Sequence, residues 1–311
     1  MSDLILHHYP QSPFAEKARL MLGFKGLSWH SVMIPPVMPK PDLTALTGGY
    51  RKTPVMQVGC DIYCDTALIA RRLEHEKAMP ALFPEGREAA ASGLAQFADQ
   101  VLFQHAVAIN FQPKGLAERF GSLPEAVAKA FMADRQALFA GGTASRLDTA
   151  VALSQWPSLL GRLETQLERD GDFLLGDTPS IADFAYYHPL WFVGSNKAVA
   201  EALDPYPAVQ AWMRRMADMG HGAHSEMNGE EALRIARDSD PEPLPDTPFM
   251  SPGGFTQGQT VSVSAVDYGT DPVTGSLVHE DAEEIIIART DERAGEVRVH
   301  FPRFGFKVVA A

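Results

Sequence analysis

Residues 4–19 read LILHHYPQSPFAEKAR and decide the first part of the fold. The apolar run at the start of this stretch has the length of a short strand and ends at the turn Tyr9-Pro10. Ser12 and Pro13 then open an amphipathic run. Serine is a preferred helix N-cap and proline is favoured at the first helical position. The stretch therefore predicts strand, turn and helix, with the Ser12 hydroxyl at the positive end of the helix.

The role of Ser12 stays open at this point. A serine-proline pair at a helix start most often has a structural role, which is to cap the helix. A capping box would place Glu or Gln at position 15, where the chain has Ala15, so Ser12 caps without a reciprocal partner. The alternative is that its hydroxyl takes part in chemistry at the helix N-terminus.

The segments up to residue 80 predict a small mixed sheet. A second strand is expected over 28–34, a proline-rich loop and a short helix follow, and a third strand begins at Pro54. A turn at 59–61 makes 62–64 its hairpin partner, and Asp65-Thr66 open a further helix. The order is βαβ, then a β-hairpin, then α, which defines a first domain over residues 1–80.

Residues 85–238 predict an all-α second domain, because alanine-rich segments of 3.6-residue period replace the strand patterns. Ser180 followed by Asp183 is a capping-box variant that fixes the start of an aromatic-rich helix. His188-Pro189 interrupt this helix, and either a kink or a break is compatible with the sequence. The expected helices are 87–111, 124–141, 155–170, 181–193, 207–219 and 229–237.

Residues 239–253 contain five prolines and predict a stiff linker. Beyond it, residues 254–311 alternate with a period of two, which predicts four or five short antiparallel strands in a small barrel or curled sheet. Expected strands are 261–265, 284–289, 297–301 and 304–308, with turns at Asp271-Pro272, Thr274-Gly275 and Ala294-Gly295. A core this small is marginal alone, so we expect it to dock on the helical domain.

Composition narrows the classes of function. The net charge of the 311 residues is −12 with a pI near 5.3, and residues 240–311 alone hold 12 acidic and 5 basic side chains, which argues against nucleic acid or an anionic membrane as partner. No apolar run approaches the length of a membrane span. The two cysteines, Cys60 and Cys64, fit neither a CxxC redox pair nor a zinc site, so we expect core or hairpin cysteines, no metal and a cytoplasmic protein.

Three separated motifs then carry a resemblance to one family. They are Tyr9–Arg19, Thr53-Pro54-Val55 and the run from Asp65 to Ile69. Their order and spacing, followed by an all-α region with a Ser-Ile-Ala-Asp cap, resemble the glutathione S-transferase superfamily, in its serine-type, bacterial-like form, over residues 1–220. The resemblance implies a thioredoxin-like glutathione-binding domain, a helical-bundle second domain and a homodimer. Residues 254–311 have no counterpart in the usual two-domain members.

The resemblance also implies the site residues. Ser12 matches the catalytic serine, whose hydroxyl stabilises the glutathione thiolate, with Pro13 and Phe14 beside it. The tyrosine of tyrosine-type members would fall on His8, so Tyr9 is one residue off and should face away. The expected glutathione-binding residues are Pro13, Phe14, Lys52, Thr53, Pro54, Val55, Asp65 and Thr66.

Each of these binding residues has an expected task. A cis bond at Thr53-Pro54 would present the main chain of Val55 as an additional edge strand for the peptide-like ligand. Asp65 and Thr66 would hold the γ-glutamyl end, although family members more often have Glu or Gln and then Ser. Lys52 and Lys40 each have the length to reach the glycine carboxylate.

The first functional hypothesis is an enzyme that attacks a small apolar electrophile with the glutathione thiolate, transferring alkyl or aryl groups. A second is a non-catalytic glutathione-fold binding or scaffold protein that uses the acidic β region to dock a partner. A third is a glutathione-dependent reductase or isomerase. Aromatic residues of the helical domain either line a cleft for the electrophile or belong to its core: Phe103, Phe111, Trp191 and Phe192.

Overall fold

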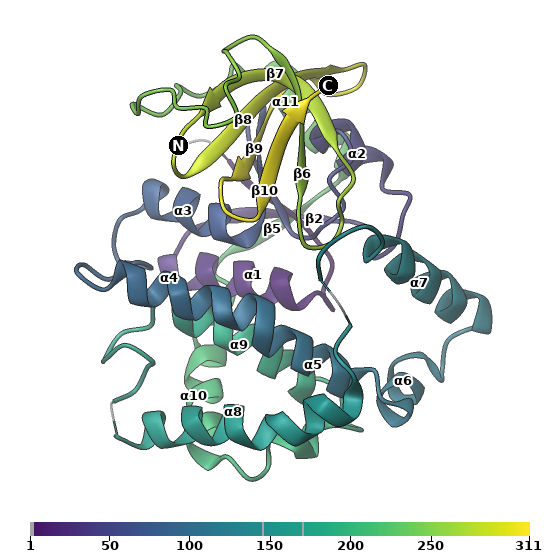
Figure 1. Ribbon diagram of the computed structural model, residues 1–311, viewed down its shortest axis with the longest axis vertical. Coiled ribbons are helices and arrows are strands. Elements are labelled where there is room, and N and C mark those ends of the chain that lie inside the picture. The colour runs from purple at the N-terminus through teal and green to yellow at the C-terminus, as the bar shows by residue number, and fades with distance from the viewer. Residues whose placement is uncertain (1–2, 145, 170) are drawn as a thin grey trace.

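The computed structural model describes residues 3–144, 146–169 and 171–311. Figure 1 shows the helices of the middle of the chain below a sheet that the N-terminal and C-terminal strands build together. The strands are β1 (Leu4–His8), β2 (Trp29–Met33), β3 (Val55–Val58), β4 (Asp61–Cys64), β5 (His224–Met227), β6 (Thr260–Ala265), β7 (Val273–Glu280), β8 (Glu284–Asp291), β9 (Gly295–Pro302) and β10 (Phe306–Ala310). The helices are α1 (Pro13–Lys25), α2 (Pro41–Thr47), α3 (Thr66–Glu76), α4 (Glu88–Phe97), α5 (Phe103–Asn110), α6 (Pro113–Phe120), α7 (Glu125–Leu138), α8 (Thr149–Arg169), α9 (Ile181–Gly194), α10 (Pro207–Asp218) and α11 (Gly229–Asp238), with a π-helical turn at Ala98–Leu102 and a 3₁₀ turn at Ala200–Leu203.

The thioredoxin-like unit is present as predicted. β1 runs parallel to β2 and antiparallel to β3, and β3 forms a hairpin with β4. The buried residues of α1 and α3 join those of α4, α5, α8, α9 and α10 in one hydrophobic core. The helical region therefore shares one hydrophobic core with the sheet, beneath one of its faces.

The C-terminal strands extend this sheet. The expectation that they dock mainly on the helical domain is therefore wrong, because their main contact is with the N-terminal strands. β9 pairs in parallel with β4, so the described strands form one sheet in the order β10-β6-β7-β8-β9-β4-β3-β1-β2-β5. An exposed strand edge carries unpaired N–H and C=O groups, and pairing with another strand satisfies them. The buried residues of these strands share a second core with α2 and α11 (Figure 1).

The chain returns to the N-terminal sheet before the C-terminal strands begin. The predicted helix 229–237 is α11, and it packs on α2, β2 and β9 rather than in the helical bundle. The preceding strand β5 pairs in parallel with β2 and was not predicted. Its sequence, His-Ser-Glu-Met, lacks apolar alternation because its side chains are exposed or half-buried, and only the neighbouring strand decides its conformation.

Two further differences have local causes. Thr274-Gly275 was predicted as a turn but lies inside β7, where a Cβ on Gly275 would stand 2.6 Å from the Ala288 carbonyl oxygen. Glycine there allows a close approach of neighbouring strands instead of a chain reversal. Pro189 does not break α9, and the predicted 87–111 helix is continuous but contains the π turn.

The predicted cap of α9 is confirmed. The Asp183 carboxylate accepts hydrogen bonds from the Ser180 backbone at 2.9 Å and from the Trp212 indole at 3.0 Å. Among the described residues, no helix has both the length and the apolar composition that a bilayer crossing requires.

Candidate functional site

Strand register brings the three sequence motifs to one end of the sheet. His7, near the end of β1, pairs with Val55 at the start of β3, and Val55 pairs with Cys64 at the end of β4. Antiparallel neighbours start where their partner ends. The Ser12 turn after β1, the Thr53-Pro54 approach to β3 and the Asp65-Thr66 start of α3 therefore lie beside one another.

Ser12 caps α1 as predicted. Its Oγ accepts a hydrogen bond from the Ala15 backbone N–H at 3.2 Å, Pro13 is the first residue of the helix, and the serine is only 3% exposed. Because Oγ accepts in this contact, its proton remains free to be donated. The hydroxyl thus sits at the positive end of a helix dipole.

The Thr53-Pro54 bond is cis, as the sequence motif led us to expect. β3 is not an edge strand, however, since it lies between β1 and β4. The description of Val55 as part of an edge strand is therefore wrong, while a ligand contact of its main chain stays a prediction. Any contact of its backbone with a ligand is confined to the strand end, where Val55 follows Pro54.

Asp65 has the backbone conformation φ 76°, ψ 140°, and the structure reports no other described non-glycine residue at positive φ. Its carboxylate accepts from the Ala67 backbone at 2.9 Å, which confirms the predicted cap of α3. Thr66 is the first residue of that helix and is 3% exposed. A strained backbone at such a position is common at ligand sites, where the surrounding structure enforces it.

The two candidate lysines differ in their partners. Lys40 is 4% exposed and donates to the Thr53 hydroxyl at 3.0 Å. Burial, and next the positive charge of Arg135, lower the pKa of Lys40 to about 8. Lys52 instead forms an ion pair at 2.6 Å with Asp267 of the C-terminal strands, and its ammonium lies 4.2 Å from the centre of the Tyr268 ring.

Tyr9 and His8, the two alternatives to Ser12 as the catalytic residue, have structural contacts within the protein. Tyr9 packs against the second core, on the α2 side of the sheet. His8 contacts the Ser31 hydroxyl at 2.9 Å and the Arg19 guanidinium at 3.0 Å. Burial, followed by the Arg19 charge, lowers the pKa of His8 to about 3, so this imidazole is neutral at physiological pH.

Aromatic side chains continue from Ser12 into the helical region. Phe14 lies 4.7 Å from Phe103, which lies 6.5 Å from Phe192, and Phe192 lies 6.4 Å from Phe111, all between ring centres. Trp191 is outside this row and packs against the main core. Three of the four aromatic residues considered in the sequence thus form a row with Phe14.

A buried charge network lies one turn beyond Ser12 and was missed by the sequence analysis. Lys17 and His188 contact the two oxygens of Asp99 at 2.7 and 2.8 Å. Burial raises the pKa of Asp99, but the Lys17 charge and the His188 hydrogen bond bring it below its usual range. Burial lowers the pKa of His188 to about 4. Asp99 belongs to the π turn, and an acidic residue inside an alanine-rich helix was its one sequence signal.

The two cysteines are buried thiols. Both are free and buried in the second core. Burial raises the pKa of Cys60 to about 11 and the pKa of Cys64 well above its usual value, so both stay protonated at neutral pH. Within the described residues, no group of three or more His, Cys, Asp and Glu side chains has a metal-binding arrangement.

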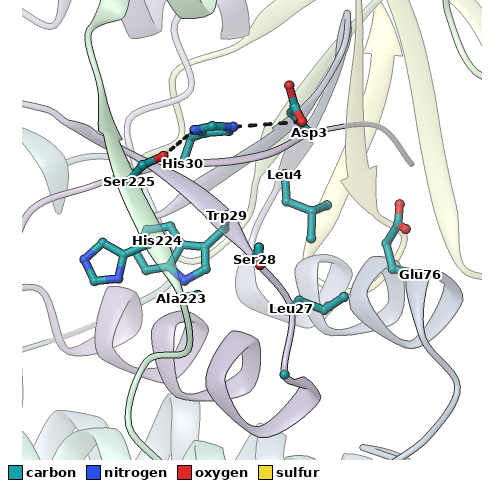
Figure 2. A pocket seen from close by; sticks show the side chains of 11 residues that line it. Asp3, Leu4, Leu27, Ser28, Trp29, His30, Glu76, Ala223, His224 and Ser225 are labelled. Carbon is teal, nitrogen blue, oxygen red and sulfur yellow. Dashed lines mark hydrogen bonds and ion pairs between the residues drawn. The ribbon is translucent and has the colours of Figure 1, made fainter.

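A separate pocket of about 410 Å³ lies at the opposite end of β1 (Figure 2). His30 stands between Ser225, which it contacts at 2.9 Å, and Asp3, at 3.9 Å. The His224 ring stacks on Trp29 with 4.6 Å between centres. None of the predicted site residues lines it, because Asp3 precedes β1 whereas Ser12 follows it.

Comparisons with known proteins identify two family domains in the chain. The model of the glutathione S-transferase N-terminal domain matches residues 6–81, and that of the C-terminal domain matches residues 118–215. No curated protein sequence matches the chain.

Solved structures extend the match to the full chain. A GST-like protein from Pseudomonas syringae is 50% identical over 100% of both chains, with a TM-score of 0.85. A glutathione S-transferase from Methylobacillus flagellatus, solved with GSH bound, is 19% identical over 70% of this chain and 99% of its own, with a TM-score of 0.51. Poplar glutathione transferase F1 is 13% identical over 70% and 94%, also with a TM-score of 0.51. The last two share the fold alone, while the first, together with the two domain models, places this chain in the glutathione S-transferase superfamily.

Proposed function

We propose that the protein is a serine-type glutathione transferase, which activates the thiolate of glutathione for attack on a small apolar electrophile. The observation that carries the proposal is the strand register that brings Ser12, Val55 and Asp65-Thr66 to one end of the sheet. Each of these residues offers a group that one part of the tripeptide requires.

The γ-glutamyl end of glutathione has complementary partners at the start of α3. The Asp65 carboxylate suits its ammonium group, and the Thr66 hydroxyl with the N–H groups of the helix suits its carboxylate. The backbone of Val55 at the strand end suits the cysteinyl peptide group. Lys40, which is buried beside Thr53 and pairs with no carboxylate in the part of the chain that the structure describes, suits the glycyl carboxylate.

The energy that thiolate formation requires is within reach of Ser12 and its helix. A free thiol has a pKa of about 8.5, so its ionisation at pH 7 needs about 2 kcal/mol of selective stabilisation. A hydrogen bond to a charged group contributes roughly 1.5–3 kcal/mol. A helix N-terminus adds roughly 0.3–1 kcal/mol. Together they cover the requirement.

The thiolate then attacks the electrophile. Its sulfur forms the new bond to the electrophilic carbon, and the electron pair moves to the leaving group or into an adjacent acceptor group. The aromatic row from Phe14 to Phe111 begins two residues after Ser12, and we assign the apolar contacts of such a substrate to it. We infer a cytoplasmic homodimer from the superfamily, and sedimentation of the purified chain checks the dimer.

Calorimetric titration with glutathione tests the proposal, combined with ultraviolet measurement of the bound thiolate across pH. In Ser12→Ala the pKa of the bound thiol should rise by about 1–2 units, because one charge-assisted hydrogen bond is lost. Ser12→Thr keeps a hydroxyl and is the matched control.

The outcomes separate the alternatives. Absence of binding at millimolar glutathione would refute the proposed function. Binding with an unchanged thiol pKa in Ser12→Ala would remove Ser12 from its role. Binding with a lowered pKa but no turnover of any electrophile would favour the binding-protein alternative.

A further inference from the structure

The C-terminal strands reach the candidate glutathione site through the loop between β6 and β7. In Figure 1 the strand β6 descends toward the end of α7. Hydrogen bonds join the residues that follow β6 to the end of α7 and the residues after it. The Gly269 N–H donates to the Leu138 carbonyl at 2.7 Å, and the Thr143 N–H donates to the Val266 carbonyl at 3.0 Å. We call these two segments, residues 138–144 and 266–270, the clasp.

The clasp is tightly fitted. A Cβ on Gly142 would lie 1.7 Å from the carbonyl oxygen of Asp267, so only glycine allows the two backbones to approach this closely. The rings of Phe139 and Tyr268 stack with 4.7 Å between their centres and 18° between their planes. These contacts hold the Asp267 and Tyr268 side chains in a fixed position at Lys52.

The Asp267 carboxylate forms an ion pair with the ammonium group of Lys52. The ion pair spans 2.6 Å, and the side chains of Lys52 and Asp267 are 11% and 34% exposed. Lys52 directly precedes Thr53, whose hydroxyl is bound by Lys40. Lys40 thus contacts Thr53 itself and Lys52 is its chain neighbour, and of these two lysines Lys52 has a carboxylate partner among the described residues.

The Tyr268 ring lies against Lys52, the residue before the cis Thr53-Pro54 motif, with 4.2 Å between the ammonium nitrogen and the ring centre. Burial raises the pKa of Tyr268 well above its usual value, and the negative charges of Asp267, Asp65 and Asp99 raise it further. Asp65 caps α3 at the proposed γ-glutamyl subsite, and Asp99 belongs to the network next to Ser12. Burial and these carboxylates therefore keep the Tyr268 hydroxyl protonated at neutral pH.

We propose that Asp267 is a specificity-determining residue, which competes with the glycyl carboxylate of glutathione for Lys52. This inference rests on the proposed function. A ligand with a free glycyl carboxylate gains Lys52 only by displacing Asp267, whereas a ligand with a capped glycyl end leaves the Lys52–Asp267 pair intact. The C-terminal strands thereby reduce the preference of the site for the free carboxylate.

The test compares glutathione with its glycyl ethyl ester by calorimetry, in wild type and in Asp267→Asn. Asparagine keeps the size of the side chain and the backbone hydrogen bond from Ala144. Asp267→Asn should bind glutathione roughly fivefold more tightly, while its affinity for the ester stays within error of wild type. Asp271→Asn removes the same charge from the same loop without touching Lys52 and should change neither affinity.

A double-mutant cycle completes the test. In a Lys52→Met background the Asp267→Asn substitution should no longer change glutathione affinity, because the group for which both carboxylates compete is gone. If wild type binds glutathione and Asp267→Asn binds it equally or more weakly, the inference is overturned. The proposed function then still stands. Failure of every variant to bind glutathione or its ester would overturn both.

Discussion

Asp61 Oδ1 and His300 Nε2 lie 2.9 Å apart where β4 pairs with β9. The other ring nitrogen of His300 lies 3.2 Å from Glu284, and the Tyr63 ring stacks on the imidazole at 4.4 Å between centres. A histidine of the C-terminal strands is therefore buried between two carboxylates at the junction with the N-terminal sheet. This arrangement links the stability of the junction to pH.

Stability should fall as His300 loses its proton. Burial lowers the pKa of His300, but the hydrogen bonds and charges of Asp61 and Glu284 outweigh burial and raise it above 6.5. Because the folded-state pKa exceeds the unfolded one, this contribution is complete below about pH 6.5 and is lost as pH rises through the folded-state value. His300→Gln should cost roughly 3 kcal/mol near pH 6 and less at alkaline pH, by urea unfolding. The exposed His75→Gln is the control. A cost that is the same at both pH values would contradict this account.

Asp65 should combine two separable roles, a cap and a charge. Asp65→Asn keeps a side-chain oxygen for the Ala67 N–H and tolerates positive φ, so stability should stay nearly unchanged. Glutathione affinity should drop about tenfold, because the partner of the γ-glutamyl ammonium is lost. Asp65→Ala should lose affinity and also about 1 kcal/mol of stability. Calorimetry and thermal unfolding measure the two effects. Equal affinity of Asp65→Asn and wild type would exclude the charge role.

Lys40 should make ligand binding depend on pH in the range near 8. Its pKa is lowered to about 8, so a growing share of the free protein lacks this positive charge as pH rises through that value. The affinity for S-methylglutathione, which has no thiol to titrate, should therefore weaken between about pH 7 and pH 9. In Lys40→Arg the charge persists and this part of the pH dependence should disappear.

The Lys40 comparison has its control built in. The amino group of the ligand titrates equally with wild type and variant, so only the difference between their profiles reports Lys40. Identical profiles by calorimetry would show that Lys40 does not hold the glycyl carboxylate.

Local sequence signals predicted the elements of the fold well. Ser12 and Asp65 act as the predicted caps, and the Ser180–Asp183 cap forms as expected, because each donor and acceptor lies within three residues along the chain. Alternation of apolar residues predicted β6, β9 and β10, and the consecutive isoleucines 285–287 predicted β8, for the same reason. β5 was not predicted because its side chains are exposed or half-buried and show no apolar pattern. Its extended conformation is decided by its pairing with β2.

The site could be predicted only in part. The sequence indicated Ser12, the Thr53-Pro54 bond and Asp65-Thr66, and the register brings them together. It did not indicate the Lys17–Asp99–His188 network, whose members lie 82 and 89 positions apart, or the partner of Lys52. An ion pair has no local pattern in the sequence, because its partners are selected by folding rather than by spacing.

The sequence by itself determined where helices and strands begin and which family motifs the chain carries, since capping and periodicity depend on neighbouring residues. Only the tertiary structure decided that β9 closes the edge of β4 and that Asp267 reaches Lys52 across 215 positions. Each contact supplies a partner to a group that would otherwise be unpaired. β9 pairs with the edge of β4, and Asp267 pairs with the largely buried charge of Lys52.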